Sequence, residues 1–93
     1  MTKHEEYEEI IAHFIERKRL TVSEIQKKGK AGIRLAAKVY NEWKKYHDDV
    51  FWHNAIYEMS FMEEPPTPMR IMVEFDISYY FAKRLFDYYM EMI

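Results

Sequence analysis

The residues whose types and spacing could support a molecular function are concentrated between Arg17 and Lys45. This segment contains ten Lys and Arg residues but only two Glu residues, so its net charge is +8. Cationic side chains at this density can neutralise the phosphates of a nucleic acid, and a solvated helix surface is the alternative use of such charge. The cations are Arg17, Lys18, Arg19, Lys27, Lys28, Lys30, Arg34, Lys38, Lys44 and Lys45.

The middle of this segment has the pattern of two helices joined by a tight turn. Ser23 is expected to cap a short helix through Lys28, because its hydroxyl can accept a free amide of the first turn. Gly29 and Gly32 would then permit a sharp reversal of the backbone. A second helix is expected to follow, with a buried stripe at helical spacing that consists of Ile33, Ala36, Ala37, Tyr40 and Trp43. Its opposite face carries Arg34, Lys38, Asn41 and Lys45. The pattern predicts a helix-turn-helix whose second helix lies in a DNA major groove.

The same residues carry a resemblance to a known family. From Ser23 to Lys38 the sequence is Ser-x-Ile-Gln-Lys-Lys-x-Lys-x-Gly-x-x-x-Ala-Ala-Lys. This run resembles the DNA-reading helices of the gamma winged-helix domain of the bacterial translocase FtsK. By position, Lys38 matches the last basic residue of that pattern, while Arg34 stands where the family has Asn and Leu35 where it has Arg. The resemblance supports the helix-turn-helix motif and implies double-stranded DNA as the partner.

The motif predicts a role for each cation. We expect Arg34 and Lys38 to face base edges or phosphates in the major groove, and Leu35 to touch a thymine methyl group. We expect the lysines in and before the turn, Lys27, Lys28 and Lys30, to hold the DNA backbone. The remaining cations would widen the cationic footprint, and these are Arg17, Lys18, Arg19, Lys44 and Lys45.

Composition excludes several classes of protein. With 93 residues, the chain can form one domain or two very small units that share a core. It contains no Cys, so disulfides and thiolate sites are excluded. No apolar run reaches the length of about 18 residues that a membrane helix needs, and the acidic N-terminus is unlike a signal peptide. We therefore expect a cytoplasmic protein without a membrane partner.

Catalytic and metal-binding constellations are missing from the sequence. The four His residues lack the paired spacing of metal ligands, so we expect no metal and no cofactor. The three Ser residues are explained as caps or surface residues and lie outside a nucleophile-elbow context. The Gly29 to Gly32 turn lacks the length and the Lys-Ser/Thr ending of a phosphate-binding loop. We do not expect an enzyme.

The charge distribution divides the chain at residue 47. Residues 1–47 carry 11 Lys and Arg against 7 Glu, a net charge of +4, whereas residues 48–93 carry 3 against 9 acids, a net charge of −6. Residues 1–47 are expected to form a basic helix-turn-helix unit that begins with an amphipathic helix over residues 4–18. Residues 48–93 are expected to form an acidic, aromatic-rich helical unit that shares the core or forms a dimer interface.

The second half is expected to repeat the first. Residues 50–62 favour a helix, so a β wing is not expected, and Pro65 and Pro66 form a linker. Thr67 and Pro68 are strong helix-start residues, although residues 69–75 also alternate as a strand would. A shift of 46 residues favours the helix, because it pairs Thr21 with Thr67, Ile25 with Ile71, Ala36 with Ala82 and Ile10 with Ile56. The comparison indicates a tandem helix-turn-helix of the all-α class.

The last helix, residues 78–93, is apolar over most of its circumference. Such a helix is buried on more than one side, either by a second subunit or as the central helix of a monomer. For the homodimer we expect an interface through Phe81 and Tyr88, which lie seven residues apart.

Two functions remain open from the sequence. The first is a small DNA-binding protein, a transcriptional regulator or DNA-organising factor. The second is a helical protein-interaction module, an adaptor or inhibitor, that binds a protein partner through residues 48–93. The net charge of +8 over Arg17–Lys45 favours DNA, and the overall acidity of the chain, with a pI of about 6.1, favours a protein partner.

Overall fold

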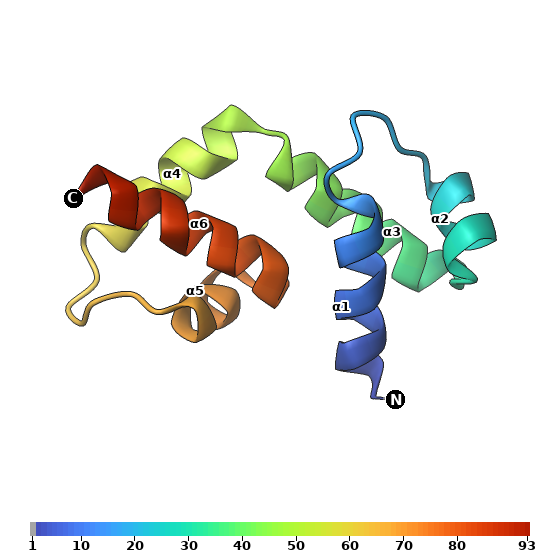
Figure 1. The fold of residues 1–93 in the computed structure, drawn as a ribbon, viewed down its shortest axis with the longest axis horizontal. Coiled ribbons are helices and arrows are strands. Elements are labelled where there is room, and N and C mark those ends of the chain that lie inside the picture. The colour runs from blue at the N-terminus through green and yellow to red at the C-terminus, as the bar shows by residue number, and fades with distance from the viewer. Residues whose placement is uncertain (1) are drawn as a thin grey trace. The chain divides into compact units, whose positions relative to one another are not determined.

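The structure, a computed structural model, describes residues 2–93, and all of their regular secondary structure is helical (Figure 1). Its elements are α1 (Lys3–Phe14), α2 (Val22–Gly29), α3 (Ile33–Tyr46), α4 (Asp49–Met59), α5 (Pro68–Phe75) and α6 (Tyr79–Met92). The all-α class is thus confirmed, and residues 2–93 contain no strand that could serve as a wing. Residues 69–75 lie in α5, so the helical alternative for this segment is the correct one.

The helices form two compact units with a boundary between His47 and Asp48. The first unit, Met1–His47, contains α1 to α3, and the second unit, Asp48–Ile93, contains α4 to α6. Each unit has buried apolar residues of its own. None of the helices within residues 2–93 combines the length and the apolar composition that are needed to cross a membrane.

Helix α1 places the expected apolar stripe in the core of the first unit. Its N-cap Thr2 accepts a hydrogen bond from the amide of Glu5, which satisfies one of the free amides of the first turn. The buried side chains are Tyr7, Ile10, Ile11 and Phe14, followed by Ile15. The helix ends four residues earlier than expected, because the chain turns after Phe14 and buries Leu20 as well.

The turn between α2 and α3 differs from the sequence-based expectation in two ways. Thr21, and not Ser23, is the N-cap of α2, and it accepts a hydrogen bond from the amide of Glu24 at 3.2 Å. Ser23 therefore lies inside the first turn. The left-handed residue of the reversal is Lys30, with φ of 51°, and neither glycine has a positive φ. Gly29 instead permits close packing, since a Cβ atom there would lie 3.2 Å from Cε2 of Phe14.

Helix α3 is rotated slightly from the expected orientation. Its buried residues are Ala36, Val39 and Glu42, whereas Ile33, which was expected on the packed face, is 61% exposed. Helix α3 packs against both α1 and α2.

The second unit repeats the first with a small change of register. Helices α5 and α6 correspond to α2 and α3 shifted by 46 residues, with identical lengths. Both α2 and α5 begin after a Thr cap and end at a left-handed residue, Lys30 or Asp76. The buried side chains also correspond, and the pairs are Ile25 with Ile71, Ala36 with Ala82 and Val39 with Leu85. The structure therefore supports the interpretation of the chain as a tandem duplication.

The first helix of each unit follows a different shift. Buried Ile10 and Phe14 of α1 correspond to buried Ala55 and Met59 of α4 when the shift is 45 residues. The connection after α4, residues 60–67, is one residue longer than residues 15–21 after α1, which accounts for the change. The expected pairing of Ile10 with Ile56 is therefore wrong, and Ile56 corresponds to Ile11.

The assignment of Phe81 to a dimer interface is also wrong. Phe81 is fully buried in the second unit, where its ring lies 5.5 Å from the ring of Phe51 and 5.6 Å from that of Trp52. Tyr88, the other expected interface residue, is 48% exposed and meets Trp52 edge-on at 5.7 Å. The α4 aromatics cover the side of α6 that contains Phe81, so the seven-residue spacing does not place both residues on one outer face.

Truncation of these two residues should have very different effects. We expect Phe81→Ala to cost about 3–5 kcal/mol of unfolding free energy, because it leaves a cavity between two aromatic rings. Tyr88→Ala should cost less than about 1 kcal/mol, since the side chain is half exposed. Urea unfolding followed by circular dichroism measures both, and equal losses would contradict this description of the core.

Candidate nucleic-acid interface

A buried hydrogen bond fixes α3 against α1. The Tyr7 hydroxyl donates to Oε1 of Glu42 at 2.8 Å, and the Glu42 side chain is 4% exposed. A carboxylate buried at this depth needs such partners, because its desolvation is otherwise very costly. The bond joins residues 35 positions apart and sets the orientation of α3 about its own axis. It therefore determines which α3 side chains face outward.

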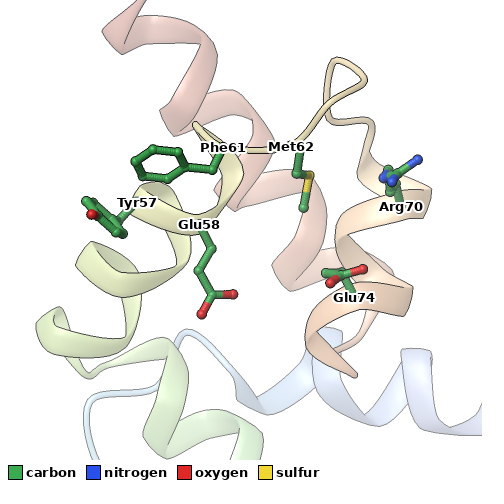
Figure 2. A pocket seen from close by; sticks show the side chains of 6 residues that line it. All are labelled: Tyr57, Glu58, Phe61, Met62, Arg70 and Glu74. Carbon is green, nitrogen blue, oxygen red and sulfur yellow. The ribbon is translucent and has the colours of Figure 1, made fainter.

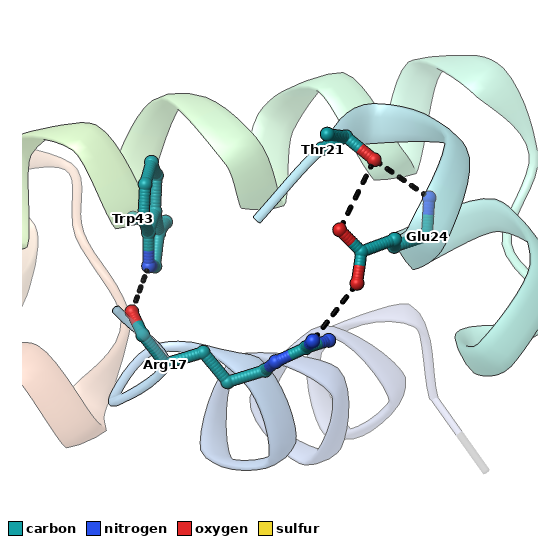
Figure 3. A network of polar contacts seen from close by, with 4 residues as sticks. All are labelled: Arg17, Thr21, Glu24 and Trp43. Carbon is teal, nitrogen blue, oxygen red and sulfur yellow. Dashed lines mark hydrogen bonds and ion pairs between the residues drawn. The ribbon is translucent and has the colours of Figure 1, made fainter. Parts of the chain in front are cut away.

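The C-terminal half of α3 is also bonded to the connection after α1. The indole nitrogen of Trp43 donates to the carbonyl oxygen of Arg17 at 2.7 Å (Figure 3). Nε2 of His47 lies 2.8 Å from the carbonyl oxygen of Ile15, which requires the proton on that nitrogen. The Trp43 ring stacks on Tyr40 at 5.6 Å. These contacts anchor the end of the helix and leave its N-terminal half to present side chains.

Arg17 takes part in an ion pair within the first unit. Its guanidinium lies 2.8 Å from Oε2 of Glu24, and Oε1 of the same carboxylate accepts the hydroxyl of Thr21 at 3.4 Å (Figure 3). The guanidinium also lies 5.9 Å from the centre of the Phe14 ring. Part of the Arg17 charge is thus neutralised internally, so Arg17 is a weaker candidate for phosphate contact than its position in the sequence suggests.

The remaining sequence-predicted cations are all exposed. They are Lys18, Arg19, Lys27, Lys28, Lys30, Arg34, Lys38, Lys44 and Lys45. We call the α2–α3 group of Lys27, Lys28, Lys30, Arg34, Lys38, Lys44 and Lys45 the basic surface. Arg34, Lys38 and Asn41 recur at i, i+4, i+7 along the outward face of α3, the spacing that a helix needs to follow a groove. The structure therefore displays these side chains on adjacent helical turns.

Two α3 side chains have additional contacts that affect their availability. The Lys38 ammonium lies 4.4 Å from the centre of the Tyr7 ring, a cation–π distance that holds it on the α1 side. Leu35, the expected thymine contact, is half-buried, so only part of its side chain faces outward. Arg34 is thus the side chain closest to the N-terminus of α3 that is both cationic and exposed.

The N-terminus of α3 offers backbone donors beside these cations. Gly32 is its N-cap, and among residues 2–93 no side chain provides a capping hydrogen bond to this helix. A Cβ atom added at Gly32 would have no heavy atom of the described chain within 4 Å, so the turn is open to solvent. Free first-turn amides and the positive end of the helix dipole attract phosphate.

The equivalent surface of the second unit has lost this character. Shifted by 46 residues, Lys27, Lys28 and Lys30 become Val73, Glu74 and Asp76, and the α6 N-cap Ser78 accepts a hydrogen bond from the amide of Phe81. Lys83 on α6 donates to Asp87 at 2.8 Å, and this hydrogen bond raises the pKa of the Lys83 ammonium above its ordinary value. Only the first unit therefore combines a cationic surface with an uncapped helix.

Sequence reasoning identified the cations but missed the residues that orient them. The apolar periodicity accounts for Tyr7 and Trp43 only as members of buried stripes, and Glu42 is one of the two acids between Arg17 and Lys45. Glu42 lies three residues after Val39, on the same face of the helix, and this spacing is the sequence signal that Glu42 is buried. Among residues 2–93, no three His, Asp or Glu side chains come together in a way that could hold a metal ion.

Comparisons with known proteins identify no relative of this chain. Nothing matches among family models, curated proteins or solved structures. The resemblance of residues 23–38 to the gamma winged-helix domain of FtsK therefore stays a prediction from the sequence.

Removal of the Tyr7 hydroxyl should weaken the first unit. We expect Tyr7→Phe to cost about 1.5–3 kcal/mol of unfolding free energy, because the hydroxyl donates to a buried charged group. Tyr88→Phe, at an exposed position, is the matched control and should cost less than about 0.5 kcal/mol. Chemical unfolding measures both variants, and a neutral Tyr7→Phe would show that the hydroxyl does not support Glu42.

Proposed function

We propose that the protein binds double-stranded DNA through α3 of the first unit, as a transcriptional regulator or DNA-organising factor. The observation that carries the proposal is the outward face of α3, where Arg34, Lys38 and Asn41 are displayed beside an uncapped helix N-terminus. In a helix-turn-helix, the N-terminal residues of the second helix contact base edges in the major groove. The site needs access to DNA, in agreement with the cytoplasmic location expected from the sequence.

The roles of the side chains follow from their positions. Arg34, on the first turn of α3, can reach a base edge, because its guanidinium can donate two hydrogen bonds to guanine. The lysines of α2 and the turn, Lys27, Lys28 and Lys30, are exposed and would contact phosphates of the DNA backbone. Arg17 is left out of this set because of its ion pair with Glu24.

A second candidate function rests on a different observation in the second unit. Tyr57 and Phe61 are 62% and 70% exposed, and their rings meet edge-on at 4.9 Å. Exposed aromatic side chains of this size are typical of protein contact surfaces. A protein partner on residues 48–93 is thus compatible with DNA on residues 1–47, and a homodimer is one form of such a partner.

Duplex binding and its salt dependence test the first proposal. With on the order of five phosphate contacts, the logarithm of the binding constant should fall against the logarithm of salt concentration with a slope of about −4 to −5. Fluorescence anisotropy with a labelled random duplex at several salt concentrations measures this slope. Undetectable binding at low salt would contradict the proposal and favour the protein-interaction module.

A pair of variants locates the binding on the first unit. Arg34→Ala should lower affinity for a preferred site by about ten-fold or more, whereas Lys3→Ala, an exposed cation on α1, should change it by less than about two-fold. Both variants remove one positive charge at an exposed position, so the comparison separates a contact from a change of net charge. Equal effects would show that binding is not centred on α3.

A further inference from the structure

The second unit contains a groove between the end of α4 and α5, with a volume of about 360 Å³ (Figure 2). It is lined by Tyr57, Glu58, Phe61, Met62, Arg70 and Glu74. Figure 2 shows Glu58 on α4 and Glu74 on α5 on opposite sides of this space, with the Met62 side chain between them. The groove thus combines two carboxylates with an apolar wall.

The charge of the groove is negative. Arg70, the only cation that lines it among the described residues, is paired with Glu64 outside it at 3.1 Å, which leaves Glu58 and Glu74 to set the local potential. The second unit as a whole has a net charge of −6. An occupant with positive charge is therefore favoured.

In the first unit, the positions that correspond to part of this groove form an ion pair. Met62 corresponds to Arg17 at a shift of 45 residues, and Arg70 corresponds to Glu24 at a shift of 46. The Arg17 guanidinium, in the connection after α1, lies 2.8 Å from the Glu24 carboxylate on α2. In the second unit, the Met62 thioether stands in place of Arg17, and Arg70 pairs with Glu64. Tyr57 and Phe61 stand where the first unit has Ala12 and Glu16. The aromatic, acidic groove is thus a feature that distinguishes the two units.

A surface that complements this groove is present on the same chain. Lys27, Lys28 and Lys30 are exposed at the end of α2, and Ile33, three residues beyond Lys30, is 61% exposed. An apolar side chain among lysines fits a groove that is lined by aromatic rings and has a carboxylate on each side. A lysine between Glu58 and Glu74, with its methylene stem on Met62, would bury apolar surface and keep its charge paired.

We propose that the α4–α5 groove of one copy binds the Lys27–Ile33 surface of a second copy, so that the protein associates head to tail. The inference deepens the proposed function, since the Lys27–Ile33 surface belongs to the basic surface assigned to DNA. The contact joins two different surfaces, so each copy carries one of each, and association can continue or close into a ring. DNA and a second copy compete for the same lysines, which makes self-association a regulator of DNA binding.

Association of the full chain without DNA tests this proposal. The weight-average mass from sedimentation equilibrium should rise with protein concentration in about 50 mM salt, and the association constant should fall at least ten-fold in about 500 mM salt, because the paired charges are screened. A wild-type protein that stays monomeric over the whole range would overturn the proposal. A more compact monomer at low salt would mean that the groove is occupied within its own chain, and it would overturn the proposal as well.

Complementation between two variants tests the head-to-tail geometry. Glu58→Lys with Glu74→Lys disables the groove, and Lys27→Glu with Lys28→Glu disables the basic partner, all at exposed positions that leave the core intact. Each variant alone should be monomeric, whereas an equimolar mixture should associate, because the intact groove of one variant then meets the intact basic surface of the other. A mixture that stays monomeric overturns the proposal.

Two controls separate a specific contact from bulk charge. Glu63→Lys with Glu91→Lys makes the same change of net charge outside the groove lining and should retain at least half of the wild-type association constant. Phe61→Ser removes an exposed ring without changing charge and should lower that constant about ten-fold or more. If the charge control weakens association as much as the groove variant does, the proposal fails. Because DNA is absent from these measurements, they stand even if duplex binding is not found.

Discussion

The conformation of a single residue between two helices controls the rest of each unit. Lys30 in the first unit and Asp76 in the second have φ of 51° and 52°, a left-handed conformation that costs a side-chain-bearing residue about 1 kcal/mol or more. The turn also provides a hydrogen bond to a carbonyl oxygen in the last turn of the preceding helix. The amide of Lys30 donates to the carbonyl of Gln26, and the amide of Asp76 donates to that of Met72. The direction of α3 or α6 follows from this reversal. The outward face of α3 depends on that direction.

The same backbone therefore carries two surfaces of opposite character. In the first unit, the turn leads into an uncapped helix surrounded by lysines, whereas in the second it leads into a helix capped by Ser78 and preceded by Glu74 and Asp76. Some buried positions hold the same residue in both units, as Ile25 and Ile71 do, whereas others differ but stay apolar, as Phe14 and Met59 do. The exposed positions are free to diverge. A duplicated unit can in this way keep one fold and present chemically different surfaces to different partners.

The sequence predicted the helices well where local signals agree. Thr67 followed by Pro68 is a cap and first-turn combination with few alternatives, and α5 begins there. The stripe from Tyr7 to Ile15 is regular enough to identify the buried face of α1. The choice between Thr21 and Ser23 as a cap could not be made locally, because both hydroxyl residues cap helices equally well. Burial of Leu20 places the helix start at Val22.

Other features depend on contacts that are distant in the sequence. The α6 helix is apolar on most sides, so its sequence does not show which side faces inward, whereas the structure shows Phe81 buried against the rings of Phe51 and Trp52. Glu42 has the appearance of a surface residue until Tyr7, 35 positions earlier, is brought beside it. In the second unit, Met62 and Arg70 stand where the first unit has the Arg17–Glu24 ion pair, a difference that is visible only when the two units are compared in structure. The sequence therefore predicts the elements and the cations of the site better than it predicts their orientation.

We propose that the two units share one fold but have different functions, and that the first unit binds duplex DNA with α2 and α3. Amide chemical shifts of the isotope-labelled full chain, followed by nuclear magnetic resonance during titration with a short duplex at low salt, test it most directly. We expect the changes to concentrate in residues 27–45 and to spare residues 79–92. Changes concentrated in α5 and α6, or an unchanged spectrum at saturating duplex, would contradict it.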